Sequence, residues 1–360
     1  MHLLPEFHLN NKKIILTPPI ISADHIKQKV SCIRAHRERL FQVSTTVQNG
    51  TLVCHNYGQG GAGWTFLFGC VHESIRQFEQ QLAAYPEYKK KPIAVIGAGC
   101  YGLLTAIILA RKGYQVRIVA KETEHTPSEK AAGFFFPRPR KSATEYERAI
   151  FYKAGIESYE TYLRIARGQH PFIAGGPVIL PAYFGLDNDP GFGPYVARGL
   201  IDQPQKVTID FGFGKYYEVM QYHILFINPR IIMQELQCTI KKLGITIIRK
   251  EVAHVAELDA PIVFNCAGFG AKQLAADKRI IPVQGHLITL QKQPIAQLQY
   301  MINVKVTQQK DGRPRGELIY FAPKDEGILG ITFKRGQTDI HANYHEFDRL
   351  LERCHKFFGG

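Results

Sequence analysis

One run of residues in the first third of the chain restricts the fold more than any other feature. Residues 91–122 read KPIAVIGAGCYGLLTAIILARKGYQVRIVAKE. The short apolar segment Ile93–Ile96 predicts a buried parallel strand, and an apolar helix is predicted from Leu103 to about Arg111. Gly113 is placed to end this helix in a left-handed conformation, and residues 114–119 predict a second strand. Strand, glycine turn, helix and strand in this order predict a βαβ unit and therefore an α/β fold.

Three glycines, Gly97, Gly99 and Gly102, lie between the first strand and the helix with G-x-G-x-x-G spacing. They allow a tight turn, a close approach of the backbone to a pyrophosphate and close packing of helix on strand. The helix N-terminus directs its free N–H groups at the phosphates. Glu122 follows Gly102 by 20 residues, where a carboxylate can accept hydrogen bonds from ribose hydroxyls. Lys121 is either a solvated strand end or a group that favours a phosphorylated ribose. The motif predicts a dinucleotide site with these contacts: Gly97, Ala98, Gly99, Cys100, Tyr101, Gly102, Lys121 and Glu122.

A second nucleotide-side element is predicted near residue 230. Asn228 as N-cap, Pro229 at the first helical position and Gly244 past the end bracket an amphipathic helix. A strand is predicted at 245–248 and another at 262–264, followed by a loop of small residues that includes Ala267 and Gly268. In open α/β sheets ligands lie beyond the carboxyl ends of the strands, so we expect this loop to face the same dinucleotide.

Length and composition predict a soluble protein of about two domains. The chain has 360 residues, 45% of them hydrophobic and 21% charged, which is globular composition. No apolar run is long enough to span a membrane, and residues 1–13 lack the features of a secretory signal. Seven cysteines without a CxxC pair favour neither zinc nor a disulfide framework and fit a reducing, cytoplasmic location.

The net charge of +14 is spread along the chain and comes with no zinc-finger, RNA-binding or helix-turn-helix signature. We therefore expect no nucleic-acid partner; attraction of a small anionic molecule explains the surplus equally well. His341 and His345 stand four residues apart but have no further ligand nearby in the sequence, so no metal site is predicted.

Residues 93–122 resemble the FAD-binding start of the D-amino-acid oxidase family of flavoproteins. The likeness extends to Ala131-Ala132-Gly133, to FNCAGFGA (264–271) with IIPVQGHL (280–287), and to LIYFAPKDEGILGITF (318–333). It covers most of residues 30–350. The resemblance implies non-covalently bound FAD as the cofactor. It also implies a Rossmann-type FAD-binding domain interleaved with an antiparallel-sheet α+β substrate domain, the D-amino-acid oxidase or glutathione-reductase-like fold.

The order of two motifs departs from this family. HNYGQGGAGWT (55–65) is similar to the glycine-rich turn that closes the flavin site, and CIRAHRER (32–39) resembles the strand with the substrate-carboxylate arginine. Both are C-terminal in the family, but both precede the G-x-G-x-x-G motif here. We therefore expect a circular permutation, in which the family's C-terminal part has moved to the front. The alternative is that residues 1–90 form an unrelated module. The predicted FAD-binding domain comprises residues 40–140 and 229–285, and the substrate-binding domain residues 1–39, 141–228 and 286–360.

The resemblance also assigns individual residues. Arg34 matches the arginine that holds the substrate α-carboxylate, a task that suits the parallel N–H groups of a guanidinium; a solvated surface arginine is the alternative. Tyr216 and Tyr222, which share a face if 211–226 is extended, are candidates for the substrate site, and packing residues are the alternative. The further cofactor contacts expected from the family are Gly60, Gly61, Ala62, Gly63, Trp64, Thr65, Ser128, Ala131, Ala132, Gly133 and Val252.

The function implied by the resemblance is oxidation of an amino acid or related amine that carries a carboxylate. Hydride passes to flavin N5, the imine hydrolyses, and oxygen reoxidises the flavin to give peroxide. The expected partners are thus a small anionic or zwitterionic amine and oxygen or an electron carrier, and the oligomeric state stays open. Two alternatives remain: a dehydrogenase of the same fold acting on glycine, sarcosine or secondary amines, and a non-catalytic FAD-binding protein. Gln284, where the family commonly has arginine, is compatible with the latter.

Overall fold

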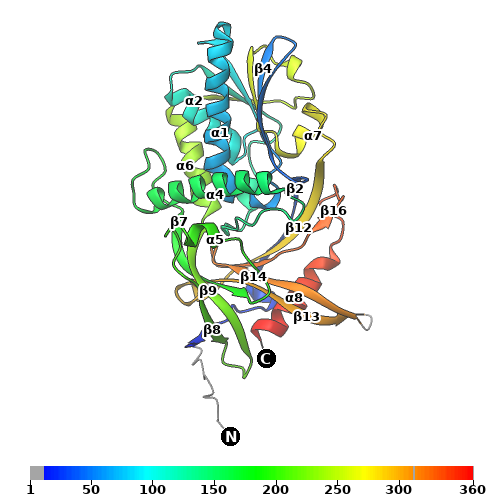
Figure 1. The fold of residues 1–360 in the computed structure, drawn as a ribbon. Coiled ribbons are helices and arrows are strands. Elements are labelled where there is room, and N and C mark those ends of the chain that lie inside the picture. Colours follow the sequence, from blue (N-terminus) through cyan, green and yellow to red (C-terminus); the bar gives the residue numbers. More distant parts are fainter. Residues whose placement is uncertain (1–11, 311–312, 360) are drawn as a thin grey trace.

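The computed structural model describes residues 12–310 and 313–359. Residues 1–11, on which the expectation about a secretory signal mainly rests, lie outside the described residues. The described strands form two sheets, one mainly parallel and one mainly antiparallel. Figure 1 shows the parallel sheet with its helices in the upper half of the view and the antiparallel sheet below it, with the long helix α4 crossing between them. The α/β fold class predicted from the βαβ unit is confirmed.

Within the described residues the parallel sheet has six strands, in the order β10-β6-β5-β11-β4-β3. All neighbours are parallel except β3 and β4, which form an antiparallel hairpin. β5 and β11 are fully buried, as the continuous apolar runs predicted, whereas the edge strand β10 is exposed. The strands are β10 (Thr246–Arg249), β6 (Val116–Ala120), β5 (Ile93–Ile96), β11 (Ile262–Asn265), β4 (Thr51–Tyr57) and β3 (Gln42–Gln48).

The antiparallel sheet has ten strands in the described part of the chain, and β12 lies where β2, β15 and β16 meet. Two of its strand pairs, β1–β8 and β7–β13, are parallel. The strands are β1 (Lys12–Ile15), β8 (Gln205–Asp210), β9 (Tyr216–Ile227), β7 (Pro177–Gly185), β13 (Met301–Lys310), β14 (Arg313–Ala322), β15 (Ile328–Gly330), β12 (Ile280–Leu290), β16 (Lys334–Arg335) and β2 (Ile26–Arg37).

The helices pack on both sheets and between them. α1 and α2 pack on the parallel sheet, α6 packs on α2, α4 packs on α1, and α8 packs on the antiparallel sheet. Their bounds are α1 (Gly63–Ala84), α2 (Cys100–Arg111), α3 (Pro127–Lys130), α4 (Glu145–Ala166), α5 (Gly193–Val196), α6 (Pro229–Lys242), α7 (Ala271–Leu274) and α8 (His345–Phe358). Short 3₁₀ turns occur at Ala23–His25, Gly60–Ala62, Pro86–Tyr88, Val255–Glu257, Gly268–Gly270 and Ile295–Gln297.

The predicted helices and strands differ from the observed ones at their ends, for local reasons. α2 begins at Cys100, three residues before the predicted start, because Gly102 lies inside its first turn rather than before it. β6 begins at Val116 instead of Tyr114 because the Tyr114 N–H still donates to the Leu109 carbonyl at the end of α2. In α6 the Asn228 side chain accepts from the Arg230 and Ile231 N–H groups, which confirms the predicted N-cap.

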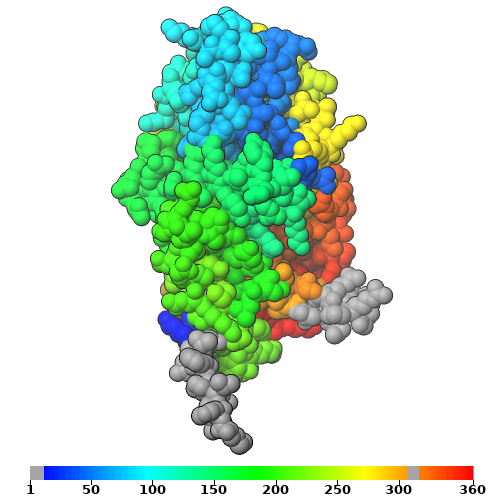
Figure 2. Space-filling model, viewed as in Figure 1, coloured from blue at the N-terminus to red at the C-terminus, as the bar shows by residue number. Residues whose placement is uncertain are grey.

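Residues 12–91 do not fold as a separate module. β4 lies between β11 and β3 inside the parallel sheet, and β2 pairs with β12 along its length in the antiparallel sheet. Leu52, Val53 and Cys54 of β4 are completely buried. In Figure 2 these first residues form one continuous surface with the later parts of the chain. The alternative in which these residues form an independent module is therefore wrong, because without them β11 and β12 would each lose the neighbouring strand on one side.

Candidate functional site

Two strand–helix connections lie next to each other at the carboxyl edge of the parallel sheet. β5 leads through Gly97–Gly99 into α2, and β4 leads through residues 58–62 into α1. β11 lies between the two strands and is followed by the 3₁₀ turn Gly268–Gly270. Because β4, β11 and β5 run parallel, the N-termini of both helices and this turn meet at one edge. This is the edge at which open α/β sheets bind ligands.

The glycines of the first connection leave no room for side chains. Gly97 has φ +103°, and a Cβ there would lie 2.5 Å from the carbonyl oxygen of Cys266. A Cβ on Gly102 would overlap the carbonyl oxygen of Gly97. The backbone of α2 is thus held close against both strands, as the predicted packing role of these glycines requires.

Ser128 and Tyr101 tie the two connections together. The Ser128 hydroxyl accepts a hydrogen bond from the Cys100 N–H at the start of α2 (3.1 Å), and the Ser128 carbonyl accepts one from the Trp64 indole N–H (3.0 Å). The Tyr101 hydroxyl donates to the carbonyl of Gly63 at the start of α1 (2.8 Å). The structure therefore brings together the G-x-G-x-x-G turn, Ser128 and the second glycine turn.

The second turn, residues 60–65, is held from the opposite side by α4 and the chain before it. The Tyr162 hydroxyl donates to the Trp64 carbonyl (2.7 Å), and the Phe136 N–H donates to the Thr65 hydroxyl (3.1 Å). Tyr162 is completely buried, and burial raises the pKa of its hydroxyl well above the ordinary value. Sequence reasoning did not single out Tyr162, because a tyrosine in a helix carries no motif.

The AAG segment after α3 crosses from the parallel sheet to β9. The Gly133 carbonyl accepts from the Ile227 N–H (2.7 Å), and a Cβ on Gly133, which has φ +88°, would overlap the Ile227 carbonyl. The Lys324 ammonium donates to the Ala131 carbonyl (3.0 Å) and to that of Glu129. Burial lowers the pKa of Lys324. This lysine, from the LIYFAPK segment, fixes a loop that sequence reasoning expected to lie along the cofactor.

Arg34 lies on β2 and is buried, with 9% of its surface exposed. Its Nη1 donates to the Thr332 carbonyl (3.0 Å), its guanidinium lies 5.3 Å from the centre of the Phe333 ring, and it covers Gly285, where any Cβ would overlap it. A Cβ on Gly61 would lie 3.4 Å from Arg34 Cδ, so the arginine also borders the second glycine turn. The alternative of a solvated surface arginine is wrong, because β12 and this turn enclose the side chain.

The electrostatics of Arg34 are those of a cation without an anion. Among the residues that the structure describes, no carboxylate oxygen lies within 4 Å of its guanidinium. Burial lowers the pKa of Arg34, while Cys32 and Tyr320 act weakly in the opposite direction. A buried charge of this kind is unfavourable until it is paired.

Tyr320 on β14 is the neighbour that the sequence reasoning missed. Its ring packs against Phe134 (5.1 Å between ring centres), and burial raises the pKa of its hydroxyl, an effect that Arg34 partly opposes. The alternation of the predicted hairpin strand could have placed it on one face, but nothing in the sequence pairs that face with Arg34.

Tyr216 and Tyr222 lie at different places along β9. They share a face, as predicted for an extended segment, but six residues of strand separate them by about 20 Å. Tyr216 is exposed beside Lys13 of the edge strand β1, while Tyr222 is half-buried against Phe184 and Phe192. The structure therefore does not bring the two tyrosines together at one site.

The remaining predicted cofactor contacts lie around the carboxyl edge of the parallel sheet. Lys121 and Glu122 follow β6 and are exposed, and Lys121 forms an ion pair with Glu251 (2.8 Å), as a solvated strand end does. Val252 packs against the apolar cluster on one side of this sheet, as does Ala267. The Ala267 N–H donates to the Asn265 side chain (3.2 Å), and Gly268 has φ +57°.

Two arginines, Arg37 and Arg140, connect the segments where the two sheets meet beside the site. Arg140 donates to the carbonyls of Arg37 and Gly58, and Arg37 pairs with Asp277 (2.7 Å). Burial together with the nearby Arg37 and Arg279 lowers the pKa of Arg140 to about 10. Gly58 and Arg37 are thereby held where β4 leaves the parallel sheet and β2 leaves the antiparallel one.

The donor set at the carboxyl edge fits a dinucleotide. The N-cap residues of α1 and α2, Ala62 and Gly99, offer no capping side chain, and neither helix has an acidic residue in its first turn, so negative phosphate groups meet no like charge there. The close-packed glycines permit a pyrophosphate to approach the backbone. A parallel sheet with this edge defines a dinucleotide-binding protein, and the antiparallel sheet next to it presents a buried arginine.

Comparison with known proteins identifies the family. The profile of the family described as FAD dependent oxidoreductase matches residues 92–360, and the chain belongs to this family. A D-amino-acid oxidase of Streptomyces coelicolor is 27% identical over 270 residues, which are 73% of this chain and 76% of the relative. The D-aspartate oxidase of Homo sapiens is 26% identical over 278 residues, which are 73% and 74% of the two chains. The protein is therefore an FAD-dependent enzyme.

A comparison of structures agrees on the fold. The L-proline dehydrogenase from P. horikoshii superposes with a TM-score of 0.50 at 13% identity, covering 74% of this chain and 76% of that one. The predicted fold class is confirmed at this level. In the described part of the chain no helix is both long and apolar enough to cross a membrane.

Proposed function

We propose that the protein oxidises an amino acid, or a related amine, whose carboxylate binds to Arg34. The observation that carries this proposal is the buried guanidinium without an acidic partner among the described residues, placed against the Gly60–Thr65 turn. A carboxylate would pair with this charge through two parallel hydrogen bonds. The relatives named as D-amino-acid and D-aspartate oxidases support the same substrate class.

The chain's own residues position the substrate rather than exchange protons with it. Arg34 would hold the carboxylate, Tyr320 would enclose it from β14, and the turn 60–65 would present backbone N–H groups to developing negative charge. Bound FAD supplies the acceptor for the hydride that leaves the amine-bearing carbon, giving an imine that hydrolyses, with oxygen as the final acceptor.

The reaction is tested with FAD-loaded protein and a panel of substrates: D- and L-amino acids, glycine and sarcosine. Peroxide release and reduction of an artificial dye are measured in parallel. Peroxide with a carboxylate-bearing amine supports the oxidase. Dye reduction without peroxide supports the dehydrogenase alternative. No turnover with either acceptor would identify a non-catalytic FAD-binding protein and refute the proposal.

Gln284 gives little support to a non-catalytic role. Its buried amide donates to the carbonyls of Asp339 and Ala342 and accepts from Asn343. It alternates along β12 with Gly285, which lies under the Arg34 guanidinium, so the two residues face opposite sides of the sheet. Glutamine at this position therefore serves the loop before α8 and does not alter the surroundings of Arg34.

We also infer that the chain is circularly permuted and that its two domains are discontinuous, with FAD-binding residues 40–140 and 229–285. The family match begins at residue 92, yet β4 lies between β11 and β3 in the parallel sheet and β2 pairs with β12 over most of its length in the antiparallel sheet. Lys29 of β2 pairs with Asp348 of α8 (3.1 Å), so the last helix lies beside the strand that would follow it in the unpermuted order. The start of β1 and the end of α8 both lie in the lower part of Figure 1.

A reordered gene tests the permutation. The new chain begins at Lys91, continues to Gly360, and is joined by glycine–serine linkers of two lengths to residues 12–90. We expect the longer-linked form at least to fold, bind FAD and match the parent in turnover. Failure of both forms to bind FAD would contradict the permutation, whatever the substrate.

All seven cysteines are unpaired, and on this basis we propose a cytoplasmic location.

A further inference from the structure

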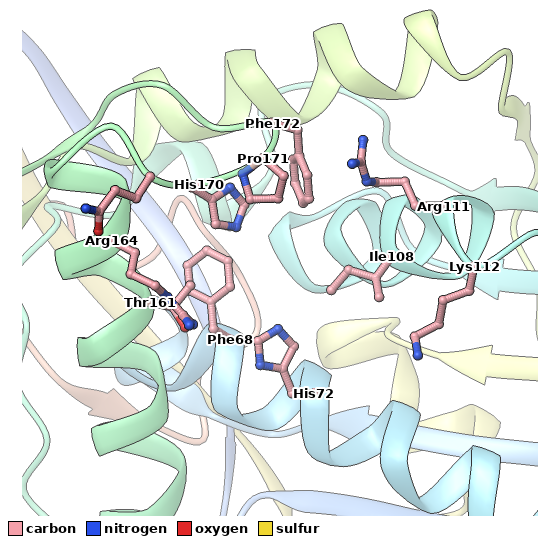
Figure 3. A pocket seen from close by; sticks show the side chains of 11 residues that line it. Phe68, His72, Ile108, Arg111, Lys112, Thr161, Arg164, His170, Pro171 and Phe172 are labelled. Atoms are coloured by element: carbon pink, nitrogen blue, oxygen red, sulfur yellow. The ribbon is translucent and has the colours of Figure 1, made fainter.

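A cavity of about 380 Å³ lies between α1, α2, α4 and the loop that follows α4. It is at the far end of α2 from the glycine motif, because Arg111 follows Cys100 by eleven residues, about 16 Å along the helix axis. Figure 3 shows Arg111, Ile108 and Phe172 on one side of this cavity and His170, Phe68 and His72 on the other. The size is within the range of small-molecule sites.

Aromatic rings line much of the cavity. The completely buried Phe68 forms part of its floor, with the His170 ring 5.8 Å away, and the Phe172 ring lies 4.5 Å from His170. The Arg111 guanidinium lies 5.4 Å from the centre of the Phe172 ring. Flat apolar ligands gain from such walls, because aromatic rings stack or meet edge to face.

The charge of the cavity is positive, and part of it is unpaired. Among the described lining residues there is no aspartate or glutamate. Lys112 and His72 are paired with Glu79 and Glu157. The two arginines, unlike Lys112 and His72, have no acidic partner: no carboxylate oxygen of any described residue lies within 4 Å of Arg111 or of Arg164. Arg164 donates a hydrogen bond to the Thr161 hydroxyl (3.0 Å).

His170 adds a neutral donor to this set. Its Nδ1 accepts a hydrogen bond from the Ile173 N–H (3.2 Å), which leaves the proton on Nε2. Burial, followed by the charges of Arg164, His72 and Arg111, lowers the pKa of His170 to about 4. At neutral pH the ring can therefore donate one hydrogen bond without carrying a charge.

We propose that this cavity is a second binding site, for a small anion with a flat aromatic body. The anionic group would lie between Arg111 and Arg164, and the body would pack on Phe172 and Phe68. Guanidinium groups without a carboxylate partner favour carboxylate, sulfonate or phosphate, and the aromatic walls exclude a fully hydrated inorganic ion. The proposal does not depend on the oxidation of an amino acid at Arg34.

The test is calorimetric titration of the FAD-loaded protein with naphthalene-2-sulfonate, compared with the uncharged 2-naphthalenemethanol. We expect one sulfonate per chain and binding of the uncharged compound at least tenfold weaker. The double variant Arg111→Gln/Arg164→Gln should weaken sulfonate binding about tenfold or more, since each charge-assisted hydrogen bond is lost. Phe172→Ala should weaken binding of both compounds. Equal affinities for the two compounds would overturn the proposal.

Two control variants distinguish this cavity from exposed surface charge and from the substrate site. Arg198→Gln/Arg249→Gln removes the same charge from exposed positions elsewhere and should leave the affinity unchanged. Arg34→Ala should also leave the affinity for the sulfonate unchanged. If Arg34→Ala abolished sulfonate binding while Arg111→Gln/Arg164→Gln retained it, the sulfonate would bind at the substrate site, and the inference would be refuted. Phenyl phosphate and phenylacetate, added as competitors, then identify the preferred anion, and displacement by neither would likewise refute it.

Discussion

Replacing Arg34 with methionine separates a substrate-binding role from a structural one. Methionine preserves most of the buried apolar volume and removes the charge. The guanidinium makes one hydrogen bond to the Thr332 carbonyl and lies against Phe333, but no described carboxylate neutralises it. The variant therefore removes an uncompensated buried cation and leaves the Thr332 carbonyl without this donor.

These two effects on stability have opposite signs and similar size. Losing a buried cation is neutral or stabilising by about 1–4 kcal/mol when an apolar side chain fills the space. An orphaned carbonyl costs about 1–3 kcal/mol. We expect the free energy of unfolding to change by less than about 2 kcal/mol. Catalysis should change far more, because two charged hydrogen bonds at about 1.5–3 kcal/mol each correspond to roughly 10²–10⁴ in kcat/KM.

The assay combines urea unfolding with steady-state kinetics on the best substrate of the panel. FAD binding, measured by quenching of flavin fluorescence, should stay within about twofold because Arg34 is not among the nearest neighbours of Gly97, Gly99 or Gly102, the turn expected to hold the pyrophosphate. An amine without a carboxylate serves as the control substrate, and its kcat/KM should change little in the variant. If the free energy of unfolding fell by more than about 3 kcal/mol while kcat/KM stayed unchanged, Arg34 would have a structural role and no role in substrate binding.

Three further predictions follow from single contacts. Gly102→Ala should weaken FAD binding at least tenfold, since its Cβ overlaps the Gly97 carbonyl, whereas Gly113→Ala, with φ +90° and open space, should cost only about 1 kcal/mol of stability and leave FAD bound. Tyr162→Phe orphans the Trp64 carbonyl and should cost about 1–3 kcal/mol in thermal unfolding; an unchanged Tm would show that this bond does not hold the turn. At Asp277, burial raises the pKa, but hydrogen bonds from Arg37 and the Arg279 N–H outweigh it and lower the pKa overall. The stability from this depressed pKa is present above the unfolded value of about 4 and is lost as pH falls through the folded value. Asp277→Asn should therefore lower the free energy of urea unfolding by about 1–3 kcal/mol at pH 7 and by much less at pH 3. An equal loss at both pH values would show that the stabilisation does not come from the charge of Asp277.

The parts of the site that could be predicted are those set by local geometry. Gly97 and Gly102 are recognisable because a turn between a strand and a helix cannot tolerate a Cβ at these positions, whatever the rest of the chain does. The helix from Pro229 is equally local, since its cap and its end lie within its own sequence. Such features depend on a few neighbouring residues, and these are visible in sequence.

The parts that escaped prediction depend on contacts between distant segments. Whether Arg34 is solvated or buried is decided by Gly285, about 250 residues away, whose missing side chain makes room for the guanidinium. Tyr320 reaches the same region only because β14 and β2 belong to one sheet. Tyrosine is frequent in strands, so the choice among Tyr216, Tyr222 and Tyr320 needs the order of the strands, which local patterns do not contain.

The proposed permutation should have little effect on stability, because closing a loop depends only weakly on its length. Ile262 of β11 pairs with Leu52 of β4, 210 residues apart in this chain. In a reordered chain that joins residue 360 to residue 12, the same pair is separated by 98 plus 41, or 139, residues. The corresponding difference in closure free energy is about 0.4 kcal/mol, far below the contribution of a completely buried strand. The order of the segments therefore leaves the folded state almost unaffected, and what matters is that β2 and β4 reach their places in the two sheets.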